Sequence, residues 1–178
     1  MFAPMCVGDL DEVTRVEREA SQFPWNRALF ADSLHAGYSS WVLRRDGQLV
    51  GHAVLLAVLD ESHLLVISIR PAWQGQGLGS QLLEYVIERA RFAGATQMFL
   101  EVRASNRVAQ TMYSRHGFTE IGRRRGYYPD ADGLREDALV MRRERATCEQ
   151  ERQEKDAFLH TRISLSGRRR WRPLRWAS

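Results

Sequence analysis

A glycine-rich hexapeptide, Gln74-Gly75-Gln76-Gly77-Leu78-Gly79, follows an apolar run and precedes a helical pattern of leucines and valines. Glycine adopts backbone conformations that other residues avoid, and it lets bare N–H groups approach an anion. The first turn of the following helix adds unpaired N–H donors and a partial positive charge. The segment therefore predicts a cradle for a diphosphate, although an ordinary helix-capping turn would use the same glycines.

The spacing of these glycines separates the nucleotide-binding alternatives. A dinucleotide-binding fold expects G-x-G-x-x-G after a strand, whereas Ser80 stands here where the third small residue belongs. A P-loop requires Gly-Lys-Ser/Thr, and the only lysine of the chain, Lys155, lies far away. The remaining pattern is Q-x-x-G-x-G, formed by Gln74, Gly77 and Gly79. It resembles the pyrophosphate loop with which GNAT acetyltransferases hold acetyl-coenzyme A.

Three polar residues further along the chain have types suited to acid–base chemistry or to binding. Glu101 lies among apolar residues of a short strand pattern, where a carboxylate is either a paired structural charge or a base. Asn106 precedes the next helical pattern and would cap it. Tyr113 follows two turns later, at a position typical of half-buried packing. The residues alone leave these alternatives open.

Several spaced blocks together resemble one family within GNAT, the ribosomal-protein alanine N-acetyltransferases of the RimI type. The resemblance covers about residues 5 to 142. It rests on Phe23-Pro24-Trp25, Leu59 to Glu61, Pro71 to Gly79, Leu100 to Asn106, Tyr113 to Phe118, Arg124 to Pro129, Asp132-Gly133 and Arg135 to Ala138. Blocks in the right order are more specific than any single motif.

The resemblance implies a site and a substrate. Glu101 would be the general base and Tyr113 the general acid. Acetyl-coenzyme A would be the co-substrate, lined by Ile67, Ser68, Ile69, Gln74, Gly75, Gln76, Gly77, Leu78 and Gly79, with Asn106 in contact. The acceptor would be the N-terminal alanine of a small-subunit ribosomal protein. An α-amino group has a pKa of about 7.7–8.0, so it is partly deprotonated at neutral pH and needs no strong base.

Four aromatic residues are candidates for binding the peptide. Phe23, Trp25, Tyr127 and Tyr128 stand beside Pro24 and Pro129 in two distant segments. They would either wall a slot for an extended peptide end or form a small aromatic core between loops.

The pattern of elements predicts an α/β (α+β) protein with a mixed central sheet, flanked by about four helices. Helices are expected from about 10 to 20, 27 to 35, 78 to 93 and 106 to 115, and Asn26 would cap the second of them. Strands are expected at 41–43, 49–59, 64–69, 98–102, 117–122 and 138–141, and Asp46-Gly47 would form the hairpin turn between the first two. One further strand, without assigned bounds, is expected before the first helix, so the order is β-α-α-β-β-β-α-β-α-β-β. It agrees with the GNAT acyl-CoA N-acyltransferase fold that the resemblance implies.

Composition and charge set the domain limits. The chain has 178 residues, of which 44% are hydrophobic. We predict an N-acetyltransferase domain over 1–146 and a basic, disordered C-terminal extension over 147–178. The domain holds 18 basic and 18 acidic residues, whereas the extension holds 8 and 4. Interleaved arginines and tryptophans in the extension allow a weak contact with RNA, although an unselected extension would look the same.

Other features exclude whole classes of protein. No apolar run approaches the roughly 20 residues that a membrane span needs, and the N-terminus is unlike a signal peptide. Cys6 and Cys148 form no disulfide framework, so a cytoplasmic location is expected. No metal-ligand spacing is present, and no metal is expected.

Alternatives to an alanine N-acetyltransferase remain. The chain could acetylate another protein N-terminus, a lysine side chain or a small amine. It could also be a coenzyme A-binding module without activity, recruited to RNA by its extension.

Overall fold

The computed structural model describes residues 1–130 and 133–144. Contacts divide the chain into the units Met1–Arg145 and Ala146–Ser178. The predicted extension over 147–178 lies outside the described residues. The helices are α1 (Leu10–Ala20), α2 (Arg27–His35), α3 (Leu78–Phe92) and α4 (Arg107–Arg115), with short 3-10 helices at Val7–Asp9 and Pro71–Trp73. The strands are β1 (Phe2–Pro4), β2 (Ser39–Arg45), β3 (Gln48–Val58), β4 (Glu61–Ile69), β5 (Gln97–Arg103), β6 (Thr119–Pro129) and β7 (Arg135–Glu144). The predicted order of elements is confirmed.

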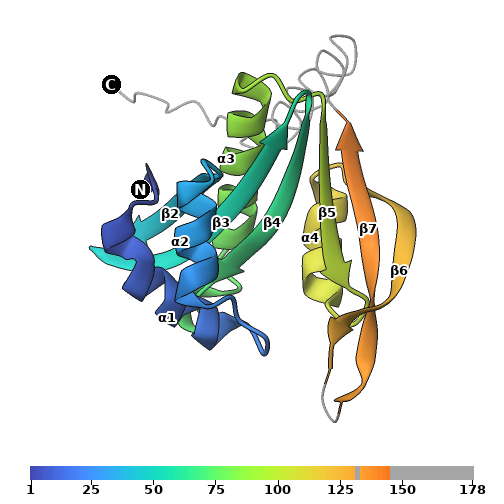
Figure 1. Ribbon diagram of the computed structural model, residues 1–178, viewed down its shortest axis with the longest axis horizontal. Coiled ribbons are helices and arrows are strands. Elements are labelled where there is room, and N and C mark those ends of the chain that lie inside the picture. Colours follow the sequence, from blue (N-terminus) through green and yellow to red (C-terminus); the bar gives the residue numbers. More distant parts are fainter. Residues whose placement is uncertain (131–132, 145–178) are drawn as a thin grey trace, which may run out of the picture. The chain divides into compact units, whose positions relative to one another are not determined.

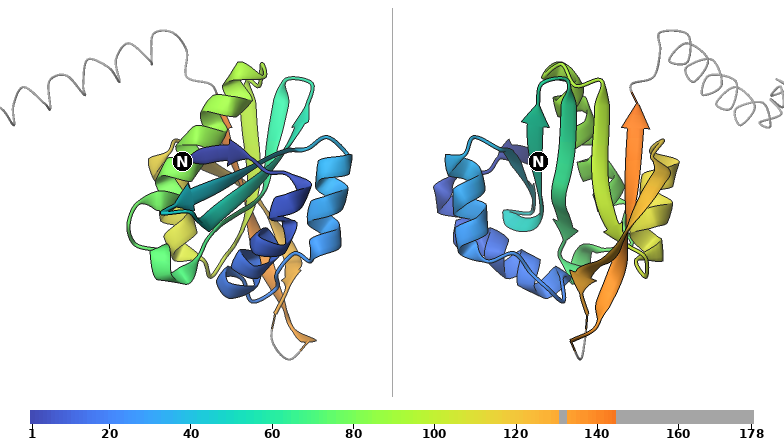
Figure 2. Two further views of the ribbon diagram at one scale, coloured as in Figure 1. Left: turned by 90° about the vertical axis from the view of Figure 1, so that its left-hand side faces the viewer. Right: turned by 45° about the vertical axis from the view of Figure 1, so that its right-hand side comes forward.

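The strands form one mixed sheet with the order β1-β2-β3-β4-β5-β7-β6. Every neighbouring pair is antiparallel except β4 and β5, which run parallel. Helices α1 and α2 cover one face of the sheet, and α3 and α4 cover the other (Figures 1 and 2). The α/β class with a mixed sheet between helical layers is therefore as predicted.

Two apolar cores separate the layers. On the α3 side, Leu82 and Val86 pack against Leu100 of β5. On the α1 side, Val13 and Val16 are fully buried beside Phe30 of α2. The sequence predicted these helices because their apolar residues recur every three to four positions. No helix in residues 1–130 and 133–144 is long and apolar enough to cross a membrane.

Local signals fix most element ends. Asp46 and Gly47 have φ values of 49° and 76°, which suit the turn between β2 and β3. The side chains of Asn26 and Asn106 accept hydrogen bonds from Leu29 N and Ala109 N, at 2.9 and 3.1 Å, and so cap α2 and α4 as expected.

Strand lengths differ from the prediction near the two long hairpins. β3 ends at Val58 rather than residue 59, because Leu59 turns with a φ of 55° and β4 then begins at Glu61. β6 and β7 are both longer than expected. The arginines and aromatic residues of β6 break the apolar alternation by which a strand is recognised, yet they pair with β7 almost to the turn.

The sheet opens between β4 and β5. Their pairing runs only from Glu61↔Gln97 to Leu64↔Leu100. Leu65 is then an extra residue in the β3–β4 pairing, since Val54 opposes Val66 and Leu55 opposes Leu64. A bulge bends the strand that carries it. Residues 65–69 of β4 therefore separate from residues 101–103 of β5, and we call this gap the β4–β5 opening (Figure 1).

Candidate active site

The β4 side of the opening presents an unshared strand edge. Residues 65–69 pair with β3 on one side and, among the described strands, with none on the other. Because the bulge reverses the alternation, Ile67 and Ile69 contact the α3-side core, while Val66 packs on the α1 side. What Ile67 to Ile69 offer a ligand in the opening is therefore their backbone N–H and C=O groups. An extended polar chain can bind such an edge as an added strand would.

The glycine loop follows β4 and leads into α3. Gly75 and Gly77 have φ values of 73° and 77°, in the left-handed region that favours glycine. Gly79 serves another purpose, because a Cβ there would lie 3.2 Å from the sulfur of Met112 on α4. The loop therefore turns tightly and brings the N-terminus of the 15-residue helix α3 to the end of β4, next to α4.

Side chains of the loop hold its shape rather than face a ligand. Gln74 Nε2 donates to the Ile69 carbonyl at 2.9 Å, and Gln76 Nε2 donates to the Ala72 carbonyl at 3.4 Å. Leu78 is buried in the core. The predicted anion cradle would therefore consist of backbone N–H groups in the first turn of α3, since such groups have no partner inside a helix.

Glu101 lies on β5 beyond its last pairing with β4. Its side chain is 27% exposed, and its Oε1 lies 3.3 Å from Arg124 Nη2 of β6. The Tyr128 hydroxyl donates to the Glu101 carbonyl at 3.1 Å. Burial, and then the charge of Glu101, raise the pKa of Tyr128 to about 12. The carboxylate is therefore accessible, while its backbone is fixed by a phenol that stays protonated.

Tyr113 reaches the same region from α4. Its side chain is buried and meets Phe118 edge-on, with ring centroids 5.8 Å apart. Burial raises the pKa of the Tyr113 phenol, and nearby Tyr128 raises it further. Burial of the side chain agrees with the packing interpretation of the sequence, and it leaves the hydroxyl protonated at every ordinary pH.

Glu101 and Tyr113 belong to opposite faces of β5. Leu100 and Val102 contact the α3–α4 core together with Tyr113. Because side chains alternate along a strand, Glu101 between them points to the other face. A group held in the β4–β5 opening would thus have a carboxylate on one side and a phenol on the other.

The aromatic residues divide between two places. The Arg103 guanidinium carbon lies 4.9 Å from the centroid of the Phe23 ring and 4.5 Å from that of Tyr128. Arg103 also pairs with Glu136 of β7 at 3.1 Å. Phe23 and Tyr128, which are 105 positions apart in the numbered sequence, are therefore joined by one cation. We call Phe23, Arg103, Tyr127 and Tyr128 the aromatic clamp.

The two remaining aromatic candidates, Tyr127 and Trp25, lie in different places. Tyr127 meets Tyr128 edge-on, with centroids 5.0 Å apart, and is partly exposed. Trp25 instead packs against Phe30 of α2, at 5.5 Å, in the α1-side core. Trp25 is thus core packing, whereas Phe23 and Tyr128 contact Arg103 and Tyr127 packs on Tyr128. The peptide slot stays a prediction. Arg103 was not among the predicted site residues, although its place two residues after Glu101 on a strand puts both side chains on one face.

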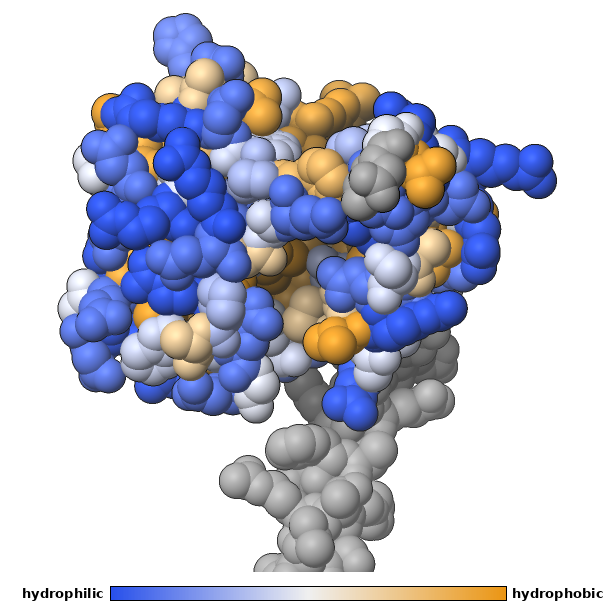
Figure 3. All heavy atoms as spheres, turned by 90° about the horizontal axis from the view of Figure 1, so that it is seen from below, coloured by the Kyte–Doolittle hydropathy of each residue, from blue (hydrophilic) through white to orange (hydrophobic). Residues whose placement is uncertain are grey.

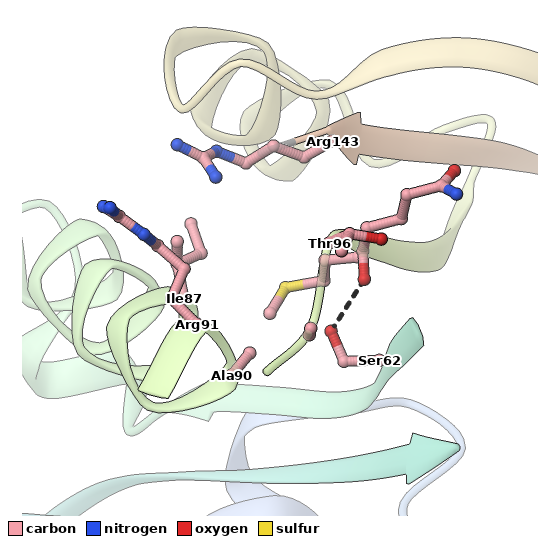
Figure 4. A pocket seen from close by; sticks show the side chains of 9 residues that line it. Ser62, Ile87, Ala90, Arg91, Thr96 and Arg143 are labelled. Carbon is pink, nitrogen blue, oxygen red and sulfur yellow. Dashed lines mark hydrogen bonds between the residues drawn. The ribbon is translucent and has the colours of Figure 1, made fainter. Parts of the chain in front are cut away.

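Surface shape agrees with this location. Viewed from the end where β4 and β5 diverge, apolar side chains line a recess between polar surfaces (Figure 3). A separate cavity of about 10 Å³ lies between α3 and the start of β5, where Ser62 Oγ donates to the Gln97 carbonyl at 3.1 Å (Figure 4). It has room for one water at most, so it is not a substrate site. Within the part of the chain that the structure describes, no three His, Cys, Asp or Glu side chains gather as metal ligands would.

The chain belongs to the acetyltransferase (GNAT) family, whose pattern it matches over residues 10–118. It is thus an acetyltransferase with the family's mixed sheet, and GNAT acetyltransferases use acetyl-coenzyme A as co-substrate. The GNAT fold expected from the sequence is confirmed.

Several relatives of the chain are named for one activity, the N-acetylation of an alanine of a ribosomal protein. The chain is 41% identical to the [ribosomal protein bS18]-alanine N-acetyltransferase of Escherichia coli K12 over 133 residues, which is 75% of this chain and 89% of that protein. It is 35% identical to the Haemophilus influenzae enzyme of the same name, over 75% and 90% of the two chains. The crystal structure of the E. coli ribosomal-protein-S18-alanine N-acetyltransferase superposes with a TM-score of 0.78 at 36% identity, covering 83% of this chain and 95% of that one. The expected resemblance to the RimI type is therefore confirmed.

Proposed function

We propose that the protein acetylates the N-terminal alanine of ribosomal protein bS18, with acetyl-coenzyme A as the donor. The relatives named above carry this activity in their names, at up to 41% identity over three quarters of the chain. A ribosomal substrate would make the cytoplasm the place of reaction. The observation that carries the chemistry is the position of Glu101 and Tyr113 on opposite faces of β5, beside the β4–β5 opening.

Acetyl-coenzyme A would bind along the free edge of β4. Its diphosphate would accept hydrogen bonds from the backbone N–H groups that open α3, below the turn made by Gly75 and Gly77. Its extended arm would bond to the backbone of Ile67 to Ile69, and Asn106 would contact it at the start of α4. A backbone N–H of the β4 edge would also stabilise the oxyanion of the tetrahedral intermediate.

The peptide would enter from the face that carries Glu101. The aromatic clamp lies on this side, where Phe23, Tyr127 and Tyr128 would wall the extended N-terminus. Trp25 would pack in the core and support the loop between α1 and α2 that carries Phe23, which we call the Phe23 loop, rather than touch the peptide. The amine would then face the thioester across the opening, and the two substrates would meet without a covalent acyl-enzyme.

Acid and base would act on opposite sides of the reacting carbon. As the new C–N bond forms, Glu101 would take the amine proton, directly or through one water. The C–S bond then breaks, and the leaving thiolate needs a donor. Tyr113, whose pKa burial raises, keeps its proton until that charge develops and would donate to the sulfur.

A panel of peptides that differ only in their first residue tests this proposal. With the bS18 N-terminal sequence, we expect a mass increase of one acetyl group on the alanine-starting peptide and none when its amine is blocked. An internal lysine in the blocked peptide reports side-chain acetylation. Preference for another first residue, for that lysine or for a small amine would replace the alanine assignment, and failure of acetyl-coenzyme A to bind would overturn the proposal.

A further inference from the structure

A buried carboxylate on α1 contacts two segments that border the candidate site, the free edge of β4 and the Phe23 loop. We call these two segments the walls of the site. The Glu17 side chain is only 3% exposed. Its Oε2 accepts a hydrogen bond from Ser68 Oγ of β4 at 2.6 Å, and its Oε1 accepts one from Trp25 N at 3.4 Å. Ser68 belongs to the free strand edge, and Trp25 to the loop that carries Phe23.

A histidine completes this cluster. His52 of β3 is fully buried and directly opposes Ser68 in the sheet register. Its Nε2 lies 3.2 Å from Glu17 Oε2, the oxygen that accepts from Ser68. Its ring meets the Phe30 ring edge-on, with centroids 5.2 Å apart. Among the residues described, neither ring nitrogen of His52 has a partner with hydrogen-bond geometry. The imidazole thus contacts the carboxylate without a hydrogen bond of ordinary geometry.

Burying this charge is a poor way to stabilise the fold. Glu17 stands four residues after Val13, on the buried face of α1, where it is the only charged residue among those described. An apolar residue of similar volume at such a position commonly serves stability as well or better, because a buried charge must be desolvated. Hydrogen bonds to β4 and to the Phe23 loop are what an apolar residue could not supply.

We infer that Glu17 is a positioning residue of the acetyltransferase site, holding the β4 edge through Ser68 and the Phe23 loop through the Trp25 N–H. This inference rests on the proposed function, because the two walls bind the two substrates only if that function holds. Phe23 continues the connection to Arg103 and Tyr128 of the aromatic clamp. The carboxylate thereby sets the spacing between the wall that binds acetyl-coenzyme A and the wall that binds the peptide.

Glu17 does not act as the base. Its carboxylate is enclosed by α1, β3 and β4, and its oxygens already accept from Ser68 and Trp25. Its effect on the reaction is through geometry. Misplacement of reacting groups by about 1 Å can cost two orders of magnitude in rate, so a loosened wall is measurable even in a protein that folds.

Three variants separate the two connections. Ser68→Ala removes only the connection to β4, and we expect kcat to fall roughly tenfold with the peptide KM unchanged. Glu17→Ala removes both connections, so the peptide KM should rise roughly tenfold as well. Glu17→Gln keeps an oxygen for the Trp25 N–H and an amide for Ser68, and should restore most of the peptide affinity.

Glu12→Ala is the matched control. Glu12 lies on the same helix and accepts a hydrogen bond from Leu49 N of β3 at 3.1 Å. It also pairs with Arg44 of β2 at 3.0 Å, and both partners lie away from the two walls. We expect a lower melting temperature with kcat and both KM values unchanged. If Glu12→Ala and Glu17→Ala alter the kinetics alike, Glu17 is only structural and the inference is overturned.

Two outcomes keep this test separate from the proposed function. If Glu17→Ala does not fold, Ser68→Ala decides, and an unchanged kcat in that variant overturns the inference. If the wild-type protein acetylates no alanine peptide, the proposed function fails, and hydrogen exchange at the Trp25 amide becomes the readout. Exchange that is faster in Glu17→Ala than in wild type supports the connection, and unchanged exchange overturns it.

Discussion

At the scale of single residues, the candidate acid and base differ most in their surroundings. Tyr113 is buried among apolar side chains, whereas Glu101 is partly exposed beside Arg124. Burial holds the proton on the phenol, whereas the exposed part of Glu101 is open to a substrate amine or a water. The two environments therefore agree with the roles that the family resemblance implies, without testing them.

Removal of the Tyr113 hydroxyl tests the acid role. We expect Tyr113→Phe to lower kcat by about a hundredfold or more, since general acid catalysis contributes 10²–10⁴. Acetyl-coenzyme A affinity, measured by calorimetry, should stay nearly unchanged because the ring still packs on Phe118. Tyr85→Phe is the control, since Tyr85 stacks on Phe2 at 4.5 Å, away from the opening. An unchanged kcat in Tyr113→Phe would show that the acid is another group.

Neutralising Glu101 should have a pH-dependent effect. Below the amine pKa of about 7.7–8.0 most of the substrate carries the extra proton, so Glu101→Gln should reduce kcat/KM most there. Near pH 9 the loss should shrink. Glu120→Gln, which alters an exposed carboxylate of β6 paired with Arg123, is the control. A loss of equal size at every pH would mean that Glu101 only orients the peptide.

At the scale of elements, the end of β4 depends on close packing with β3. Gly51 of β3 opposes Ile69, and a Cβ on Gly51 would lie 2.5 Å from Ile69 Cδ1 and 2.8 Å from the Ser68 carbonyl oxygen. A side chain there would push the strand edge out of place. The need for glycine is therefore steric, and it concerns the wall that is proposed to bind acetyl-coenzyme A.

A pair of glycine variants tests this wall. We expect Gly51→Ala to destabilise the fold by about 1–3 kcal/mol, as overpacking does, and to weaken acetyl-coenzyme A binding in calorimetry. Gly122→Ala in β6 is the control, because a Cβ there meets nothing within 4 Å. Equal affinities in the two variants would mean that the edge at Ser68 and Ile69 tolerates displacement or does not bind the co-substrate.

The sequence predicted those elements whose signals are local. Asn26 and Asn106 as caps, Asp46-Gly47 as a turn and the apolar face of α3 were all recognisable from a few neighbouring residues. The aromatic clamp and the Glu17 cluster were not, because the clamp joins three segments and the cluster joins four that only the folded sheet brings together. The bulge at Leu65, which opens the sheet, gives no sequence signal, since a valine or leucine fits a regular strand equally well.

At the scale of the whole domain, buried or paired carboxylates tie distant segments together. Burial alone would raise the pKa of Glu17, but the neighbouring His52 imidazole and the hydrogen bond from Ser68 outweigh it and hold the pKa below its usual value of 4.5. Asp9, bonded to Cys6 N and to Arg44 of β2, likewise has a lowered pKa. Such groups make stability depend on pH.

The sign of this dependence follows from the direction of the shifts. A carboxyl with a lower pKa in the folded state binds fewer protons there than in the unfolded state, so stability rises with pH across that interval. The contribution of Glu17 is complete above the unfolded value of about 4.5 and is lost as the pH falls through the folded value. The melting temperature should therefore change little from these groups between pH 7 and 5, and should fall below about pH 4.5.

Calorimetric melting of the full chain from pH 7 to pH 3 measures this effect. Glu17→Gln removes one titrating carboxyl, so its melting temperature should fall less steeply below pH 4.5 than that of the wild type. Glu88→Gln, at an exposed position of α3, should keep the wild-type slope. Parallel curves for wild type and Glu17→Gln would contradict a lowered pKa at Glu17, because protonation of that buried group would then cost the folded protein nothing.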